Sequence, residues 1–270
     1  MEIHGFQKLT LLDFPGRTAC TVFLAGCNFR CPFCHNSLLV TEKPDACMTD
    51  ADLAAYLKKR RGLLDGVAIT GGEPTLYPEL DGLCRMIKEL GYQVKLDTNG
   101  TNPGKLRALV SDGLVDYVAM DIKNSPEKYD VTAGINKADL EKICESIDFL
   151  RSGAVDHEFR TTVAVGLHTA DDIRSLGKAF GGDDRYYLQN FKESEYTIEK
   201  GFAPFSYDGM EELLKAAREY FPNAKIRGED DGAALNTVPP AALKNEYFRK
   251  RAACSGFSGK HKDFIRKEEP

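Results

Sequence analysis

Three cysteines lie close together at Cys27, Cys31 and Cys34, in the spacing C-x3-C-x2-C. Gly26 and Pro32 mark this stretch as a loop, from which three thiolates can point at one centre as they could not from a regular strand or helix. Four protein thiolates close a zinc site or an iron–sulfur cubane. Three thiolates would leave one iron of a [4Fe–4S] cluster without a protein ligand, so that this iron could bind another molecule.

Two other interpretations of the cysteines remain open from the spacing alone. His35 follows the last cysteine of the loop and could complete a structural zinc site. In a reducing compartment, cysteines can also be ordinary buried or surface thiols. That is our interpretation of the scattered ones, which are Cys20, Cys47, Cys84, Cys144 and Cys254.

Strands and helices alternate along most of the chain. An apolar stretch at 18–25 predicts a buried strand that leads directly into the cysteine loop. Further strands are predicted at 66–70, 93–96, 114–120, 157–165 and 186–190, with a last short apolar stretch at 225–227, and helices at 49–61, 78–90, 104–111, 137–151, 170–180 and 208–220. This alternation predicts an α/β fold with parallel strands and right-handed crossovers. Six units fall short of the eight of a closed barrel, so we expect an open, partial (β/α)6 TIM-type barrel.

The other chemically suggestive groups lie at the carboxyl ends of predicted strands, where sites in α/β sheets are built. The second, third and fourth strands end in Gly71-Gly72-Glu73-Pro74, Asp97-Thr98-Asn99-Gly100 and Asp121-Ile122-Lys123. Arg160 lies inside the fifth strand, where an unpaired charge would be costly, and Gln189 ends the sixth. Each alone could be a turn or an ordinary ion pair. Their convergence with the cysteine loop on one face is the stronger signal.

The cysteine spacing, with the aromatic Phe33 before the last cysteine, resembles the cluster motif of the radical S-adenosylmethionine (SAM) enzymes. Cys34-His35-Asn36 resembles more narrowly the glycyl-radical-enzyme activases, which include the activating proteins of pyruvate formate-lyase and of anaerobic ribonucleotide reductase. The resemblance covers about residues 5–228, and the N-terminal run and length are most similar to the ribonucleotide-reductase group. It implies a [4Fe–4S] cluster held by the three cysteines, whose open iron chelates SAM.

Site residues follow from this resemblance. The implied SAM-binding set is Phe33, Gly71, Gly72, Glu73, Asp97, Asn99, Lys123, Arg160 and Gln189. The glycine pair would let its backbone approach the SAM ammonium closely. A monovalent cation, expected at Asp97, Thr98, Asp121 and Ile122, would separate the two aspartates from the SAM carboxylate. Asp13 precedes the first strand of the barrel and would contact the glycyl loop of the substrate.

The implied activity is reductive cleavage of SAM to a 5′-deoxyadenosyl radical, which takes hydrogen from a glycine of a partner glycyl radical enzyme. We expect the partner to be the anaerobic ribonucleotide reductase, and the electron donor to be a flavodoxin or ferredoxin. Only Cys47 occurs between Cys34 and Gly71, so the added clusters of some activases are absent. Two alternatives stay open: a radical SAM enzyme that modifies another peptide, RNA or small molecule, and an iron–sulfur or zinc protein that only binds or senses.

Composition limits where the protein works and what it binds. The 270 residues are 42% hydrophobic and 29% charged, as in ordinary globular proteins. There is no apolar run of bilayer-spanning length and no signal-peptide pattern, so we expect a cytoplasmic protein with reduced cysteines. The net charge is −5, although residues 243–270 carry +4, and the acidic remainder argues against a nucleic-acid partner. We predict a barrel domain at 1–228 and a C-terminal extension of unknown role at 229–270.

Overall fold

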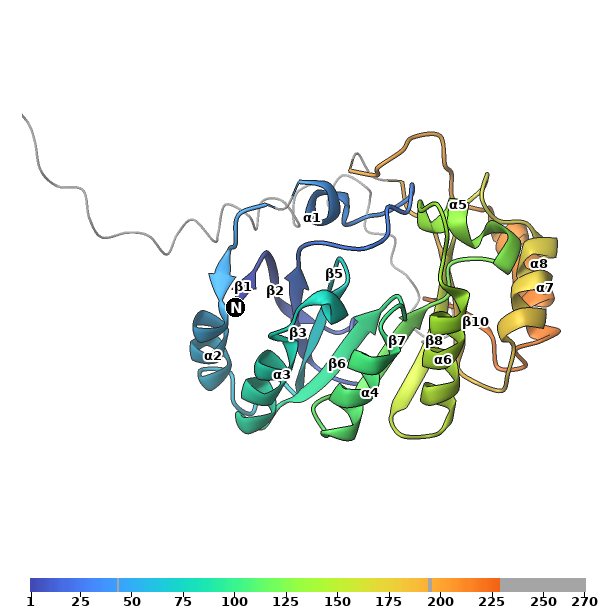
Figure 1. Cartoon of the computed structure of the whole chain (residues 1–270). Coiled ribbons are helices and arrows are strands. Elements are labelled where there is room, and N and C mark those ends of the chain that lie inside the picture. Colours follow the sequence, from blue (N-terminus) through green and yellow to red (C-terminus); the bar gives the residue numbers. More distant parts are fainter. Residues whose placement is uncertain (43, 194–195, 229–270) are drawn as a thin grey trace, which may run out of the picture. The chain divides into compact units, whose positions relative to one another are not determined.

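The computed structural model describes residues 1–42, 44–193 and 196–228, which build an open sheet with helices along it (Figure 1). The strand order is β10-β9-β8-β7-β6-β5-β3-β2. Its strands are β2 (Gly5–Thr10), β3 (Ala19–Leu24), β5 (Gly66–Gly71), β6 (Gln93–Thr98), β7 (Tyr117–Asp121), β8 (Asp156–Val163), β9 (Tyr186–Asn190) and β10 (Lys225–Ile226). The end strands β2 and β10 each pair on one side within the described residues, so the barrel is not closed. This confirms the predicted open α/β fold.

A helix follows each of the strands β3, β5, β6, β7, β8 and β9, as the alternation predicted. The principal helices are α2 (Asp50–Lys58), α3 (Leu80–Glu89), α4 (Pro103–Ser111), α6 (Leu140–Arg151), α7 (Ala170–Phe180) and α8 (Tyr207–Arg218). Two five-residue helices, α1 (Ser37–Thr41) and α5 (Tyr129–Ala133), lie near the strand ends at the top of Figure 1. None of the helices in the described ranges combines the length and apolar character needed to cross a membrane.

Two features at the N-terminus differ from the expectation of parallel strands only. β2 pairs antiparallel with β3, and β1 (Glu2–Ile3) pairs antiparallel with β4 (Met48–Thr49) in a separate two-stranded sheet. β2 gives a weak sequence signal because it lies at the edge of the sheet, is only partly buried and carries a register shift between Gln7 and Thr10. Cys254 and the predicted extension at 229–270 lie outside the described residues, so the domain boundary at residue 228 and the separate extension stay predictions.

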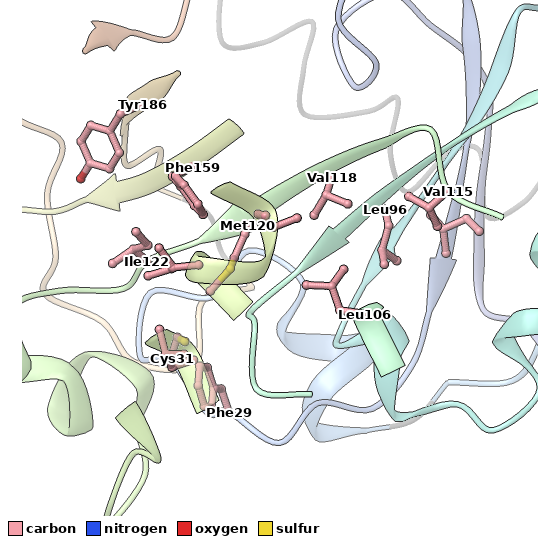
Figure 2. Close-up of a cluster of buried hydrophobic side chains, with 14 of the residues drawn as sticks. Phe29, Cys31, Leu96, Leu106, Val115, Val118, Met120, Ile122, Phe159 and Tyr186 are labelled. Atoms are coloured by element: carbon pink, nitrogen blue, oxygen red, sulfur yellow. The ribbon is translucent and has the colours of Figure 1, made fainter. Parts of the chain in front are cut away.

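The face of the sheet that meets the helices is apolar. Figure 2 shows Leu96, Val118 and Phe159 of neighbouring strands gathered with Leu106 of α4. All six residues of β3 are buried, as predicted for an inner parallel strand. Phe29 and Cys31 of the cysteine loop belong to the same buried cluster (Figure 2), so the loop is anchored in the hydrophobic core.

Successive side chains of a strand point to opposite faces of the sheet. In β6 to β8, the side chains on the face opposite the apolar core are mainly polar. They include Lys95 and Asp97 of β6, Asp121 of β7, and Glu158 and Arg160 of β8. Lys95 and Glu158 are almost fully buried. Because a buried charge is costly unless it is paired, this face must carry its own ion pairs, and these lead directly to the site.

We expect Phe221→Ala to lower the free energy of unfolding by about 3–5 kcal/mol, the usual cost of deleting a fully buried aromatic ring. Phe221 is completely buried and stacks on Tyr186 of β9, with ring centroids 4.0 Å apart. Chemical denaturation followed by circular dichroism measures the loss. Tyr207→Ala is the control, because Tyr207 is 67% exposed and should change stability little. Equal losses in the two variants would contradict this account of the core.

Candidate active site

A cavity of about 420 Å³ lies where the strands β5 to β9 end beside the cysteine loop. Most of the predicted site residues line it. They are Cys27, Cys31, Phe33, Cys34, Gly71, Gly72, Asp97, Thr98, Asn99, Asp121, Lys123, Arg160 and Gln189. Residues from six separate segments therefore meet at one place, as the strand-end argument predicted.

Glu73 does not line the cavity, in contrast to its predicted place among the SAM-binding residues. Its carboxylate accepts hydrogen bonds from the backbone amide and hydroxyl of Thr75, from the hydroxyl of Thr98 and from the backbone amide of Asn99. Burial raises the pKa of Glu73 in spite of these four bonds. Through these hydrogen bonds, Glu73 links the end of β5 to the end of β6.

Two other predicted residues also lie away from the cavity lining. The Ile122 side chain is completely buried, and its carbonyl accepts a hydrogen bond of 2.7 Å from the hydroxyl of Thr161. The Asp13 carboxylate accepts one of 2.5 Å from the hydroxyl of Thr21, in the middle of β3. The structure therefore assigns Asp13 a contact within the protein, and its contact with a substrate stays a prediction.

Close backbone contacts hold the cysteine loop in position. A Cβ atom on Gly72 would lie 1.9 Å from the carbonyl oxygen of Gly26, and one on Gly134 would lie 2.0 Å from that of Arg30. The Asn36 side chain also donates a hydrogen bond of 2.9 Å to the carbonyl of Gly71. Only glycine permits these approaches, so the loop is fixed from β5 on one side and from the end of α5 on the other.

Burial disfavours the thiolate form of all three loop cysteines. Burial raises the pKa of both Cys27 and Cys31 to about 11, and it also raises the pKa of Cys34. Lys123 opposes this rise at all three sulfurs and so favours the thiolates that an iron ligand requires. Among the described residues, no three His, Cys, Asp or Glu side chains lie together as a ready-made site for a single metal ion.

An alternating row of charges crosses the polar face of β6, β7 and β8, in the order Lys95, Asp97, Arg160, Asp121, Lys123. Lys95 pairs with Asp97, and Arg160 bonds both aspartates, at 3.1 Å to Asp97 and through its Nε to Asp121. Lys123 bonds Asp121 at 2.8 Å. Burial would raise the pKa of each aspartate, but Arg160 and the neighbouring lysine outweigh burial and hold it below the ordinary value.

This charge row bears on the predicted monovalent cation. The cation was expected because two aspartates repel a nearby carboxylate unless a positive charge lies between them. Arg160 already lies between Asp97 and Asp121, and the row carries three positive and two negative side chains. Lys95 does not line the cavity, but the side chains that do, including Lys192 and Arg227, carry a net charge of +2, which suits a ligand carboxylate directly. The cation therefore stays a prediction, with a weaker electrostatic reason than the sequence suggested.

The cavity residues that were not singled out from the sequence include Thr70, Thr162, Lys192 and Arg227. Thr162 lies two residues after Arg160, so the period of two along a strand could have found it. Arg227 was not predictable because its position depends on the pairing of β10 with β9. Its guanidinium bonds Glu158 and covers the ring of Tyr187 at 3.8 Å.

Comparison with known proteins identifies the family. The family model of the radical SAM superfamily matches residues 21–200, and the chain therefore belongs to that superfamily. It is 32% identical over 236 residues to a protein of Methanocaldococcus jannaschii named "Putative glycyl-radical enzyme activating enzyme", covering 83% of this chain and 95% of that one. It is also 29% identical to a pyruvate formate-lyase-activating enzyme of Clostridium pasteurianum, over 54% of this chain and 63% of the relative.

Solved structures share the fold at low sequence identity. A structure of TYW1 with a lysine-pyruvate adduct bound has a TM-score of 0.54 at 19% identity and covers 75% of this chain and 74% of its own. Streptococcus suis SuiB bound to S-adenosylmethionine has a TM-score of 0.58 at 16% identity. The match covers 77% of this chain and 52% of the SuiB chain. These likenesses support the partial-barrel fold and not a particular substrate.

The cofactors of the superfamily are a [4Fe–4S] cluster and SAM, and the residues of this cavity fit both. Three thiols line one end, near Lys123, and supply the ligand set that leaves one iron open. The net positive row beside them suits the SAM carboxylate, and the exposed backbone of Gly71 and Gly72 suits its ammonium. Cys27, Cys31 and Cys34 would hold the cluster.

We expect Gly72→Ala to reduce cluster loading several-fold, because the added methyl group would collide with the Gly26 carbonyl and displace the cysteine loop. Iron and sulfide are measured after anaerobic reconstitution of the full chain. Gly82→Ala in α3 is the matched control, since nothing lies within 4 Å of a Cβ at that position. Full loading of Gly72→Ala would show that the close contact does not position the loop.

We expect Asp121→Asn to lower the free energy of unfolding by about 3 kcal/mol near neutral pH, because it leaves Arg160 and Lys123 short of a buried counter-charge. The pKa of Asp121 is lowered in the folded protein, so its stabilisation is present above the ordinary value of 3.8 and is lost as pH falls through the folded value.

The difference between wild type and Asp121→Asn should therefore stay constant from pH 8 to pH 5 and narrow only below about pH 3.8. Denaturation curves at a series of pH values give this difference. Asp148→Asn on the exposed side of α6 is the control and should change stability little at any pH. A difference that narrows already between pH 7 and pH 5 would refute the lowered pKa.

Proposed function

We propose that this protein is a glycyl-radical-enzyme activase. When bound, the reduced cluster and SAM supply a 5′-deoxyadenosyl radical that takes a hydrogen atom from the Cα of one glycine in a partner enzyme. The observation that carries this proposal is the meeting of the three loop cysteines with net positive charge in one cavity at the strand ends, where Lys123, Arg160, Lys192 and Arg227 line the cavity with Asp97 and Asp121. The similarity to an activase-type relative along 95% of that relative's length supports it.

The residues of this chain bind and orient the cofactors. Cys27, Cys31 and Cys34 would ligate three irons of the cluster, and Lys123 or Arg160 would receive the SAM carboxylate. The backbone of Gly71 and Gly72 receives its ammonium group. Holding the reacting groups at fixed positions lowers the entropic part of the barrier, while the cofactors carry the bond-breaking steps.

Further site roles remain part of the proposal. Phe33 shields the site, since its ring lies on the cavity and contacts His168 and Phe191 edge to face. Gln189 and Asn99 supply hydrogen bonds to the nucleoside part of SAM. A monovalent cation beside Asp97 and Asp121 is also part of the proposal, although Arg160 already bonds both aspartates.

The partner that we propose is the anaerobic ribonucleotide reductase, and the electron donor a flavodoxin or ferredoxin. An oxygen-sensitive cluster and a partner of this kind imply anaerobic conditions. The seven cysteines of the described residues are free thiols, which also fits the reducing cytoplasm. These assignments come from the resemblance of the cysteine loop and the length of the chain.

Anaerobic electron paramagnetic resonance tests the activity. The reconstituted protein, SAM and a chemical reductant are mixed with the anaerobic ribonucleotide reductase of the same organism, and we expect a glycyl-radical doublet. Cys31→Ala should abolish the doublet and 5′-deoxyadenosine formation together, since it removes a cluster ligand. Cys144→Ala should leave both intact, because Cys144 is exposed on α6.

Two outcomes would contradict parts of the proposal. Deoxyadenosine without a doublet would keep the SAM cleavage but reject this reductase as the partner, in favour of another glycyl enzyme or a different substrate. Activity that survives in Cys31→Ala would overturn the cluster assignment.

A further inference from the structure

Four strongly exposed leucines lie on two short segments near the start of the sheet. Leu9, Leu11, Leu12 and Leu63 are 56%, 71%, 82% and 64% exposed, and they are half of the large exposed apolar residues in the described part of the chain. Exposed basic side chains accompany them. We call these residues together the basic leucine patch: Lys8, Leu9, Leu11, Leu12, Arg17, Lys58, Lys59, Arg60, Arg61 and Leu63.

Hydrogen bonds hold the two segments against each other. The hydroxyl of Tyr56, in α2, donates a hydrogen bond of 2.7 Å to the carbonyl of Lys8. Asp65 accepts from the backbone amide of Thr18 at 2.8 Å and donates its own amide to the Thr18 carbonyl at 2.7 Å. The segments are therefore parts of one surface.

The charge of this surface is opposite to that of its surroundings. The segments 8–17 and 58–65 hold six Lys/Arg and two Asp, a net of +4, whereas residues 1–228 hold 28 Lys/Arg and 34 Asp/Glu, a net of −6. The remainder of residues 1–228 thus carries −10. The two aspartates of these segments are engaged within the protein. Asp13 accepts a hydrogen bond from Thr21, and Asp65 accepts one from Thr18. A positive field with an apolar centre attracts an acidic partner that can cover the leucines.

The patch adjoins the open side of the barrel. It continues from β2, which is one of the two edge strands of the sheet. The patch lies beside the first residue of β3, and the cavity lies beyond its last residue. Because β3 has six residues and a strand rises roughly 3.3 Å per residue, the two are about 20 Å apart. A protein interface of standard size covers about 800 Å² on each partner, which is on the order of 30 Å across. A protein that inserts a loop into the cavity can therefore reach the patch as well.

We propose that the basic leucine patch is a docking surface for the protein substrate, whose matching surface is acidic and aliphatic. This proposal rests on the proposed function. A protein fits better than a nucleic acid because the exposed apolar residues of the patch are leucines and not the aromatic rings on which bases stack. Docking at the patch sets the affinity for the partner, while the chemistry in the cavity is unaffected.

The test uses the full, cluster-loaded protein and the anaerobic ribonucleotide reductase of the same organism. Two variants alter the patch: Lys59→Glu with Arg61→Glu, and Leu11→Asp with Leu12→Asp. The matched control is Lys178→Glu with Lys215→Glu, which changes the net charge equally on α7 and α8. The rate of glycyl-radical formation is measured against reductase concentration, at low and high salt, together with 5′-deoxyadenosine formed without the reductase.

We expect each patch variant to raise the half-saturating reductase concentration at least tenfold, with an unchanged rate at saturation and unchanged deoxyadenosine formation. High salt should weaken the wild type more than the Lys59→Glu/Arg61→Glu variant, because only the wild type retains the full charge attraction. The control variant should behave as the wild type does.

Three results would overturn the docking proposal. A half-saturating concentration equal to that of the control, with a normal glycyl signal, rejects docking at the patch and leaves the proposed function standing. In a second result, the wild type binds phosphatidylglycerol vesicles and the patch variants do not, while the kinetics toward the reductase are unchanged. This result assigns the patch to a membrane surface instead. No glycyl signal from the wild type rejects the proposed partner and the docking proposal together.

Discussion

Arg160 lies between two aspartates on the polar face of an otherwise apolar sheet, and much of the site depends on this arrangement. A buried guanidinium without partners would be strongly destabilising. Asp97 and Asp121, from the two preceding strands, both bond it, and a lysine flanks each aspartate. Three neighbouring strands thereby become one electrostatic unit. Because the charges alternate, each is compensated locally. With Lys192 and Arg227 added, the side chains that line the cavity carry a surplus of two positive charges.

That surplus connects the fold to the chemistry. An anionic ligand group can bind beside the cysteine loop without a metal ion to screen the aspartates, because Arg160 already separates them. Lys123 acts in two directions, since it pairs with Asp121 and also favours the thiolate forms of the loop cysteines. The same side chain therefore links the cluster end of the cavity to its SAM end.

The cysteine loop is positioned by close backbone contacts, by the core and by hydrogen bonds such as that from the Arg30 amide to the Ala133 carbonyl. Gly72 and Gly134 allow two other segments to approach the loop within the space of a methyl group. Phe29 and Cys31 are buried in the main hydrophobic cluster (Figure 2). A site built in this way is prepared before the cofactors bind, which reduces the cost of ordering them. Within the described residues, β2 and β10 are the two edge strands of the sheet and each pairs on one side only.

The sequence by itself determined the alternating α/β architecture, the open barrel and the group of strand-end motifs, because each is encoded in local spacing and periodicity. The cysteine triplet and Gly71-Gly72 were readable for the same reason. Only the tertiary structure decided what each polar group contacts. Glu73 follows the glycine pair in sequence, yet its carboxylate turns to the neighbouring strand end. Arg227 reaches the cavity only through the pairing of the last strand. Such contacts join residues far apart in the chain, and local patterns do not specify them.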